Sequence, residues 1–331
     1  MRTILLCENQ ELCLEVYNDE ILDRVTEYGL TKKVYKKEDI LNGDFSDVEY
    51  VFSTWGMSHF TEEEIKRFLP NLKCVFYAAG TVQSFARPFI NSDVKVFSAW
   101  AANAVPVAEF TAAQIVLANK GYFKMMQFMK KKEYGLAKEE APKHAGNYGT
   151  KIGIIGAGMI GKNVIKLLEA YKLNVMVFDP FLSDEDAKML GVEKVSLEEI
   201  FTECDVVSNH LANNEQTKNM LTYDLFSRMK PYSSFINTGR AAQVEEAGFI
   251  KALKERPDIS AIVDVYWQEP LPEENPLYEL DNCFLTPHIA GVACVNEYGR
   301  LSEYMINEFE CFINNKPCKY EVTRKMLETM A

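Results

Sequence analysis

Histidine is scarce in this sequence, and its cysteines show no pattern typical of a metal site or of a disulfide framework. Only four of the 331 residues are histidines, and none of the eight cysteines belongs to a C-x-x-C pair or has a histidine at metal-ligand spacing. We therefore expect no metal centre. Buried, reduced thiols are the simplest interpretation of the cysteines, with a nucleophilic cysteine as the alternative.

Positive charge and long apolar runs are also scarce. The 36 lysines and arginines are outnumbered by 48 aspartates and glutamates, which gives a formal charge of -12. This charge argues against nucleic acids and anionic membranes as partners, because both bind cationic surfaces. The apolar run in M-R-T-I-L-L-C-E-N is too short for a signal peptide, and we find no later run long enough to span a bilayer. We expect a cytoplasmic protein.

Strand-like and helix-like stretches alternate along the chain, which predicts an α/β protein with parallel sheets. A chain of 331 residues is too long for one ordinary domain. We therefore predict two Rossmann-like or flavodoxin-like parallel-sheet domains separated by a cleft. A long helix is expected to begin near Pro106 and to connect the domains. The last helical pattern, from Asn296 to Ile313, is expected to pack back on the first domain and make it discontinuous.

Three glycines in the middle of the chain form a dinucleotide-binding fingerprint. In K-I-G-I-I-G-A-G-M-I-G the pattern G-x-G-x-x-G follows a strand-like run and opens a helical one. Gly156 permits a tight turn, Gly158 lets the backbone approach a pyrophosphate, and Gly161 lets helix and strand pack closely. The helix N-terminus, which includes Met159 and Ile160, attracts the anion.

An acidic residue, Asp179, ends the next strand-like run, V-M-V-F-D. A carboxylate at this place binds the ribose hydroxyls of NAD and repels the 2′-phosphate of NADP. No arginine or lysine follows it before Lys188. We therefore predict that the cofactor is NAD. The alternative is a glycine-rich turn beside a surface aspartate.

Three later strand-like runs each end beside a chemically useful side chain, Arg240, Glu269 or His288. Parallel strands deliver these residues to one sheet edge, where open α/β sheets bind ligands. An imidazole acid, a carboxylate that orients it and a guanidinium that grips a carboxylate are the groups needed to reduce an anionic ketone. Taken singly, each is also an ordinary surface or loop residue. His210 follows the strand-like run D-V-V-S-N and is expected to line the cofactor site.

The chain resembles the D-isomer-specific 2-hydroxyacid dehydrogenases over almost its whole length. The motifs V-A-E-F-T-A-A, Y-G-T-K-I-G-I-I-G-A-G-M-I-G, F-I-N-T-G-R, D-V-Y-W-Q-E-P-L-P and L-T-P-H-I-A-G follow one another in the family's order. The resemblance implies a substrate domain of residues 1–104 and 298–331 and an NAD-binding Rossmann domain of residues 105–297. It also implies a homodimer that interconverts a small 2-keto acid and a D-2-hydroxy acid with NAD.

The resemblance implies a role for each site residue. Arg240 orients the substrate carboxylate, and Glu269 pairs with His288, the acid/base. A loop of the first domain binds the substrate carboxylate through backbone N–H groups, and its place corresponds to Ala79 and Gly80. The remaining cofactor contacts, including Asp264 at the nicotinamide carboxamide, are Thr238, Gly239, Asp264 and Gly291.

Some positions depart from the family's pattern. Ala241 and Ala212 stand where the family usually has glycine and proline, and T-V-Q-S follows Gly80 in place of acidic and amide residues. Because this loop differs from the family's pattern, the resemblance does not identify the substrate. Trp55 and Trp100 end strand-like runs of the first domain and either wall the substrate pocket or belong to the core.

Two other functions fit parts of this pattern. Corepressors that share the fold are NAD(H)-sensing interaction proteins and retain similar residues, so a sensor of this type is the main alternative to an enzyme. A formate dehydrogenase of related fold is disfavoured, because its usual glutamine would stand where Glu269 stands. A turnover assay with 2-keto acids separates enzyme from sensor.

Overall fold

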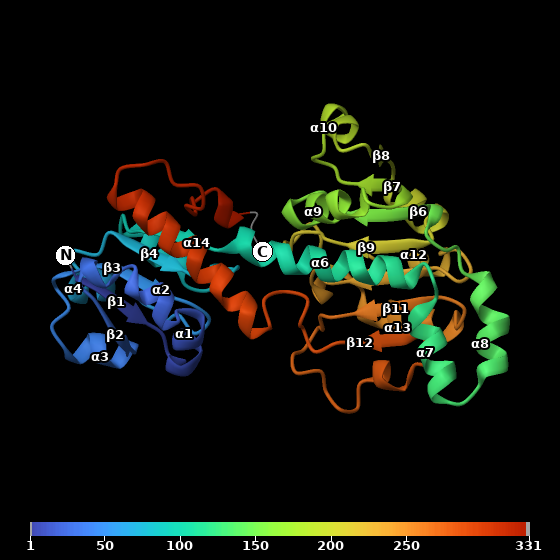
Figure 1. The fold of residues 1–331 in the computed structure, drawn as a ribbon, viewed down its shortest axis with the longest axis horizontal. Coiled ribbons are helices and arrows are strands. Elements are labelled where there is room, and N and C mark those ends of the chain that lie inside the picture. Colours follow the sequence, from blue (N-terminus) through green and yellow to red (C-terminus); the bar gives the residue numbers. More distant parts are fainter. Residues whose placement is uncertain (1, 329–331) are drawn as a thin grey trace. The chain divides into compact units, whose positions relative to one another are not determined.

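The computed structural model describes residues 2–328, which divide into two compact units (Figure 1). Unit 1 contains residues 2–103 and 292–328, and unit 2 contains residues 104–291. Each unit is built on one sheet in which all strand pairs are parallel. The predicted α/β class with two parallel-sheet domains is confirmed. The division of substrate and NAD binding between the two domains stays a prediction.

Unit 1 has a five-stranded sheet of order β2-β1-β3-β4-β5, the order of flavodoxin-like folds. Successive residues of a strand point to opposite faces, so Ile4 and Leu6 join one apolar cluster and Leu5 joins the other. The strands are β1 (Arg2–Leu6), β2 (Leu30–Tyr35), β3 (Val48–Ser53), β4 (Cys74–Tyr77) and β5 (Lys95–Ser98). The helices between them are α1 (Gln10–Val16), α2 (Asp19–Asp23), α3 (Lys37–Asn42), α4 (Glu62–Phe68) and α5 (Ala86–Asn91).

The helix α14 (Val295–Ile313) completes one side of unit 1. Its buried residues Leu301, Met305 and Phe309 repeat every four positions and therefore form one face of the helix. That face joins the cluster that contains Leu5. In Figure 1, α14 lies beside strands and helices made from the first part of the chain. The helix predicted from position 296 to 313 is confirmed.

Unit 2 has a seven-stranded sheet of order β12-β11-β10-β9-β6-β7-β8. This is the Rossmann order with one further strand, and it reverses between β6 and β9. The strands are β6 (Tyr148–Ile155), β7 (Lys172–Phe178), β8 (Glu193–Lys194), β9 (Val206–Asn209), β10 (Ser234–Asn237), β11 (Ser260–Val263) and β12 (Cys283–Leu285). The helices are α7 (Tyr122–Lys130), α8 (Tyr134–Glu140), α9 (Met159–Leu168), α10 (Asp184–Met189), α11 (Leu197–Glu203), α12 (Tyr223–Ser227) and α13 (Glu246–Glu255).

The helix α6 (Trp100–Ala118) corrects two expectations: where the helix begins, and that no apolar run is long enough to span a bilayer. It begins at Trp100 rather than near Pro106, which lies inside the helix and cannot donate a backbone hydrogen bond there. Burial of residues such as Ala108 and Ile115 in an apolar cluster offsets that loss. By length and composition α6 is also long and apolar enough to cross a membrane, with a mean hydropathy of 1.3. More than half of it is buried inside the structure, as in a core helix.

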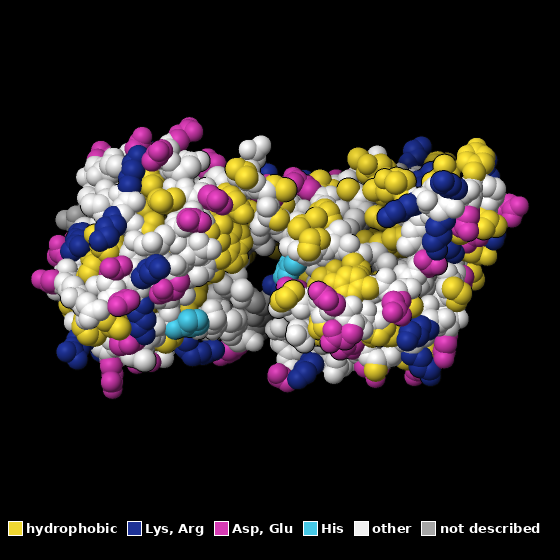
Figure 2. Space-filling model, turned by 90° about the horizontal axis from the view of Figure 1, so that it is seen from below, with side chains coloured by type: hydrophobic (Ala, Val, Ile, Leu, Met, Phe, Trp, Pro, Cys, Tyr) yellow, Lys and Arg dark blue, Asp and Glu magenta, His cyan; other side chains and the backbone are white. Residues whose placement is uncertain are grey.

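Acidic side chains are spread over the face of the molecule that Figure 2 shows. On the face shown in Figure 2, acidic and basic side chains are interspersed on both units. Among the described residues, ion pairs join charged side chains, such as Arg24 with Glu310 at 2.8 Å and Lys95 with Glu321 at 2.8 Å. This face therefore offers no continuous cationic surface.

The cysteines are all unpaired, and five of the eight are buried. Cys294 is exposed, whereas Cys311 and Cys318 are partly buried. Among residues 2–328, no group of three or more histidine, cysteine, aspartate and glutamate side chains is arranged to hold a metal ion. The expectation of buried thiols therefore holds for five of the cysteines.

Candidate active site

The predicted site residues of unit 2 gather at the carboxyl edge of its sheet. Each follows the end of a strand, and because the strands are parallel all of them reach the same edge. Gly156 and His210 flank the point between β6 and β9 where the strand order reverses, the place at which open α/β sheets bind ligands. The residues that follow the strands are Gly156 (β6), Asp179 (β7), His210 (β9), Thr238, Gly239 and Arg240 (β10), Asp264 and Glu269 (β11) and His288 (β12).

The three fingerprint glycines meet three different steric demands. Gly156 has a φ of +93°, and a Cβ there would lie 2.8 Å from the carbonyl oxygen of His210. A Cβ at Gly161 would lie 2.1 Å from the carbonyl oxygen of Gly156. At Gly158 a Cβ would meet nothing within 4 Å. The first and third glycines thus permit close packing, and the second leaves open space at the N-terminus of α9, where a pyrophosphate fits.

The carboxylate of Asp179 is held beside this glycine turn. Its Oδ2 accepts a hydrogen bond from the amide of Ala157 at 2.7 Å, and its Oδ1 accepts one from the amide of Phe181 at 2.7 Å. Met159 and Ile160 form the first residues of α9, the former exposed and the latter half-buried. These residues fit the adenosine and pyrophosphate parts of a dinucleotide.

His288 and Glu269 form a hydrogen-bonded pair. The Nδ1 atom of His288 donates to Oε2 of Glu269 at 2.7 Å, and both side chains are partly exposed. The other oxygen of Glu269, Oε1, accepts from the amide of Tyr266 at 3.1 Å. This arrangement fixes the tautomer of a neutral ring and leaves Nε2 as the nitrogen that meets a ligand.

Asp264 is fully buried and bound to the loop that carries His288. Its Oδ1 accepts from the hydroxyl of Thr286 at 2.6 Å and from the amide of Ile289 at 2.9 Å. Its Oδ2 accepts from the amide of Ala290 at 2.8 Å. Gly291 follows directly, so the predicted cofactor contacts Asp264 and Gly291 are brought together.

Arg240 is anchored through its own turn. Its Nη1 donates to the carbonyl oxygen of Gly239 at 2.7 Å. Burial lowers the pKa of Arg240, and the negative charge of Glu269 opposes that shift. Beside this turn, the hydroxyl of Thr238 shares a hydrogen bond of 2.8 Å with that of Thr111 on α6. The charge of Glu269 therefore acts on Arg240.

A buried amide network supports the arginine turn. The Oε1 atom of Gln243 accepts from the side chain of Asn209 at 2.7 Å and from the amide of Arg240 at 3.3 Å. The Oδ1 atom of Asn237 accepts from Asn209 at 3.1 Å and from the amide of Gly239 at 3.2 Å. Sequence reasoning missed Asn209 and Gln243, although Asn209 ends the strand-like run D-V-V-S-N and Asn237 lies in the motif F-I-N-T-G-R.

His210 is buried against the same edge. Its Nε2 shares a hydrogen bond of 2.9 Å with the hydroxyl of Ser208. Within residues 2–328 its Nδ1 has no partner. Burial lowers the pKa of His210 to about 4, so this ring is neutral near pH 7. A neutral ring suits a structural or lining role better than an acid/base role.

In unit 1 the loop after β4 carries the predicted substrate contacts Ala79 and Gly80. The hydroxyl of Ser98 donates to the carbonyl oxygens of Ala79 and Gly80 at 2.9 and 2.6 Å. The amide of Ala79 donates to Tyr77 at 2.9 Å. No described residue accepts from the amide of Gly80, which makes it the better candidate for binding a carboxylate.

Trp55 and Trp100 are both half-buried and both follow strands of unit 1. The ring of Trp55 meets that of Tyr298 edge-on at 6.3 Å, and the ring of Trp100 meets that of Tyr320 edge-on at 5.6 Å. Trp55 also lies where the strand order reverses between β1 and β3. Each tryptophan thus packs against an aromatic ring of unit 1 and keeps part of its surface accessible.

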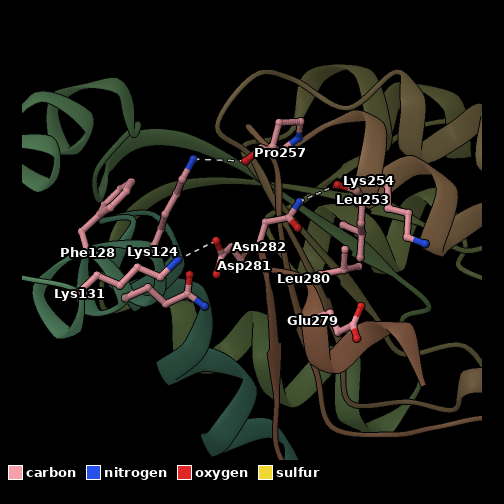
Figure 3. A pocket seen from close by; sticks show the side chains of 11 residues that line it. Lys124, Phe128, Lys131, Leu253, Lys254, Pro257, Glu279, Leu280, Asp281 and Asn282 are labelled. Carbon is pink, nitrogen blue, oxygen red and sulfur yellow. Dashed lines mark hydrogen bonds and ion pairs between the residues drawn. The ribbon is translucent and has the colours of Figure 1, made fainter. Parts of the chain in front are cut away.

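A pocket of about 400 Å³ lies elsewhere on unit 2, between α7 and the segment before β12 (Figure 3). In Figure 3, Lys124 bonds to the carbonyl oxygen of Pro257 and Lys131 pairs with Asp281. Asn282 in its lining precedes β12, whereas His288 follows that strand. The pocket therefore lies at the opposite edge of the sheet from the predicted site.

Comparisons with known proteins identify the family. Residues 112–290, more than half of the chain, match the family model described as D-isomer specific 2-hydroxyacid dehydrogenase, NAD binding domain. The glyoxylate reductase of Korarchaeum cryptofilum is 36% identical over 146 residues, which cover 44% of each protein. The glycerate dehydrogenase of Methylorubrum extorquens is 36% identical over 171 residues, 51% of this chain and 52% of that protein. The chain thus spans about half the length of these curated relatives.

A solved structure shares the whole fold. The apo form of D-mandelate dehydrogenase from Rhodotorula graminis superposes with a TM-score of 0.82 over 98% of both chains, at 20% sequence identity. The matched family domain contains the glycine turn, the arginine turn and the histidine loop described above. The chain belongs to the D-isomer-specific 2-hydroxyacid dehydrogenase family.

Proposed function

We propose that this protein is an NAD-dependent oxidoreductase that interconverts a small 2-keto acid and a D-2-hydroxy acid. The observation that carries the proposal is the hydrogen bond of 2.7 Å between His288 and Glu269, at the sheet edge that also holds the glycine turn. Glu269 orients the imidazole, so its Nε2 donates a proton to the ketone oxygen during reduction and accepts the proton of the alcohol during oxidation. NADH, when bound, supplies the hydride.

Arg240 binds the substrate carboxylate in this proposal. Its bond to the carbonyl oxygen of Gly239 uses one of five N–H donors and fixes the direction of the guanidinium. The remaining donors include a fork that matches a carboxylate. The buried amides of Asn209 and Gln243 hold the turn on which Arg240 stands. Arg240 thus positions the keto carbon relative to His288.

NAD rather than NADP is the proposed cofactor. Gly158 leaves room for a pyrophosphate, and the carboxylate of Asp179 is fixed beside the glycine turn by the amide of Ala157. A 2′-phosphate at this place would meet the negative charge of Asp179 and lose the ribose hydroxyl that a carboxylate binds. This charge favours NAD.

A homodimer and a cytoplasmic location complete the proposal. Tyr122, Met126 and Met129 lie on one face of α7, and Met126 is 53% exposed. An accessible apolar stripe of this kind suits contact with a second copy of the chain. The eight unpaired cysteines suit a reducing compartment. Light scattering of the wild type and of Met126→Glu would test the dimer, since the charged variant should be monomeric.

The enzyme is tested by following NADH oxidation with a panel of 2-keto acids that differ in size, branching and charge, and by determining the chirality of the product. Turnover with at least one keto acid and a D-product is expected. His288→Gln serves as the control for the chemistry. A protein that binds NADH tightly but turns over no keto acid would instead favour an NAD(H)-sensing interaction protein.

A further inference from the structure

We propose that Asp264 is the positioning residue for His288: its buried carboxylate holds the loop from Thr286 to Ala290 in the conformation that keeps the imidazole bonded to Glu269. The inference rests on the proposed function of His288 as the acid/base. It differs from the role implied by family resemblance, in which Asp264 contacts the nicotinamide carboxamide.

The first support is the set of donors around Asp264. Thr286 donates from two residues before His288, and Ile289 and Ala290 donate from the two residues after it. The carboxylate therefore binds the loop on both sides of the histidine. Within residues 2–328 no basic side chain pairs with Asp264, although the residue is fully buried. A buried carboxylate without a cation is costly unless hydrogen bonds satisfy it, so the carboxylate and the loop depend on each other.

The second support is the backbone of His288 itself. Its φ is +55°, in the left-handed region that is sterically unfavourable for residues other than glycine. Such a conformation persists only where surrounding contacts impose it. The bonds from the flanking residues to Asp264 supply those contacts. Without them we expect the loop to relax and the imidazole to leave Glu269.

The segment after β11 holds both members of the pair. Asp264 binds the loop of His288, while the amide of Tyr266 binds Glu269 at 3.1 Å. The hydroxyl of Tyr266 also donates to the carbonyl oxygen of Thr286 at 2.7 Å. One short stretch of chain therefore sets the position of the carboxylate and of the imidazole together.

The carboxylate of Asp264 can accept few further hydrogen bonds from a cofactor. A carboxylate oxygen accepts about two hydrogen bonds. Oδ1 already accepts from Thr286 and Ile289, and Oδ2 accepts from Ala290. Only Oδ2 has a place for one further donor. Binding the loop is thus the larger part of what this side chain does.

The variants Asp264→Asn and Thr286→Val test the inference, with Asp258→Asn as the matched control. Asp258 precedes β11 and pairs with Arg256 at 2.6 Å, so its variant removes a carboxylate from the other end of the same strand. We expect Asp264→Asn to lower kcat about 100-fold, since a displacement on the order of 1 Å at a reacting group costs about that much. Thr286→Val, which removes only one donor, should lower it about tenfold. The dissociation constant of NADH should stay close to that of the wild type in Thr286→Val, because the carboxylate of Asp264 is unchanged in that variant.

A second measurement needs neither cofactor nor substrate. In protein labelled with 15N-histidine, at a pH where the rings are neutral, the His288 ring should carry its proton on Nδ1 in the wild type and in Asp258→Asn. In Asp264→Asn and Thr286→Val it should shift toward the Nε2-protonated form that a free histidine prefers. His288→Gln assigns the signals. If Asp264→Asn does not fold, the same comparison in Thr286→Val decides.

Two results would overturn the inference. One is a His288 ring whose signals in Asp264→Asn match those of the wild type. The other is a loss of activity in Asp264→Asn that arises only from weaker NADH binding and vanishes with an acetylpyridine cofactor, which lacks the amide donor. A wild type that reduces no keto acid would contradict the proposed function instead, and the ring signals would still report the positioning.

Discussion

The carboxylate of Asp179 is bound to the amide of Ala157, which lies between the first two glycines of the dinucleotide fingerprint. The residue that we propose to sense the 2′ position of the cofactor is therefore tied to the turn that we propose to receive the pyrophosphate. This bond makes the charge of Asp179 a fixed part of the site, which leads to the first prediction.

The wild type should prefer NADH to NADPH by roughly 100-fold in kcat/KM, or about 2.7 kcal/mol. Asp179→Asn keeps an oxygen for the amide of Ala157 but removes the charge, so the preference should fall about tenfold or more. Steady-state kinetics with both cofactors measures this, and Asp184→Asn, at an exposed position, is the control. Equal efficiency of the wild type with both cofactors would contradict this role of Asp179.

His288→Gln should lower kcat about 10²- to 10⁴-fold in both directions, the usual contribution of a general acid or base. Binding of NADH, followed by its fluorescence, should remain close to that of the wild type. The exposed histidine His59, on unit 1, provides the matched control His59→Gln. Normal turnover of His288→Gln would make His288 an ordinary loop residue.

The two directions of the reaction should show opposite pH dependences. In the proposed reaction, reduction uses the imidazolium of His288 as a proton donor, whereas oxidation uses the neutral ring as an acceptor. The efficiency of keto-acid reduction should therefore fall as the pH rises, and that of hydroxy-acid oxidation should increase. The measurement is a pair of pH profiles under conditions in which chemistry limits the rate. Profiles that change in the same direction would speak against a single acid/base.

Arg240→Lys should lose about 100-fold in kcat/KM, or about 2.7 kcal/mol, because lysine offers a point charge in place of a planar fork. The guanidinium of Arg240 can bond to the carbonyl oxygen of Gly239 through one nitrogen and bind the substrate through the others. The single ammonium group of lysine cannot replace both functions. Arg228→Lys, at an exposed position of the same unit, is the control. If Arg240→Lys kept wild-type efficiency on every accepted keto acid, Arg240 would not bind the substrate.

His210 should make unit 2 less stable in acid. The pKa of His210 is about 4 in the folded protein, below the usual 6.5, so the unfolded chain binds a proton that the folded one excludes. Stability should fall as the pH drops from about 6.5 to about 4, by roughly 3 kcal/mol. Urea unfolding at both ends of this range, followed by Trp267 after Trp55→Phe and Trp100→Phe, measures it. His210→Gln should lose less stability than the parent over the same range, and an equal loss would contradict the assignment.

The sequence predicts the site best where the chemistry is local. Gly156, Gly158 and Gly161 can be read from one short segment because strand, turn and helix all lie within it. Asn209 and Gln243 could not be found this way, since they meet only when β9 and β10 pair, and buried amides look like any other polar residues.

The predicted start of α6, near Pro106, was wrong for a related reason. Pro106 is a good first-turn residue by local preference, but the buried packing of the helix outweighs the lost hydrogen bond and extends it back to Trp100. The bonds of Asp264 to the histidine loop likewise depend on the pairing of β11 with β12. Local preference therefore identified the elements, and tertiary contacts decided their ends and their polar partners.

The packing of α14 on unit 1 has a consequence for biosynthesis. Strands such as β3 and β4 leave the ribosome early, but Leu301, Met305 and Phe309, which cover one face of their sheet, are made only after the whole of unit 2. Because synthesis proceeds at about 5–20 residues per second, that face of the sheet stays uncovered for on the order of ten seconds or more. Unit 2 is continuous and can bury its own core in the meantime. Nascent unit 1 should therefore be the part of this protein that chaperones hold during translation.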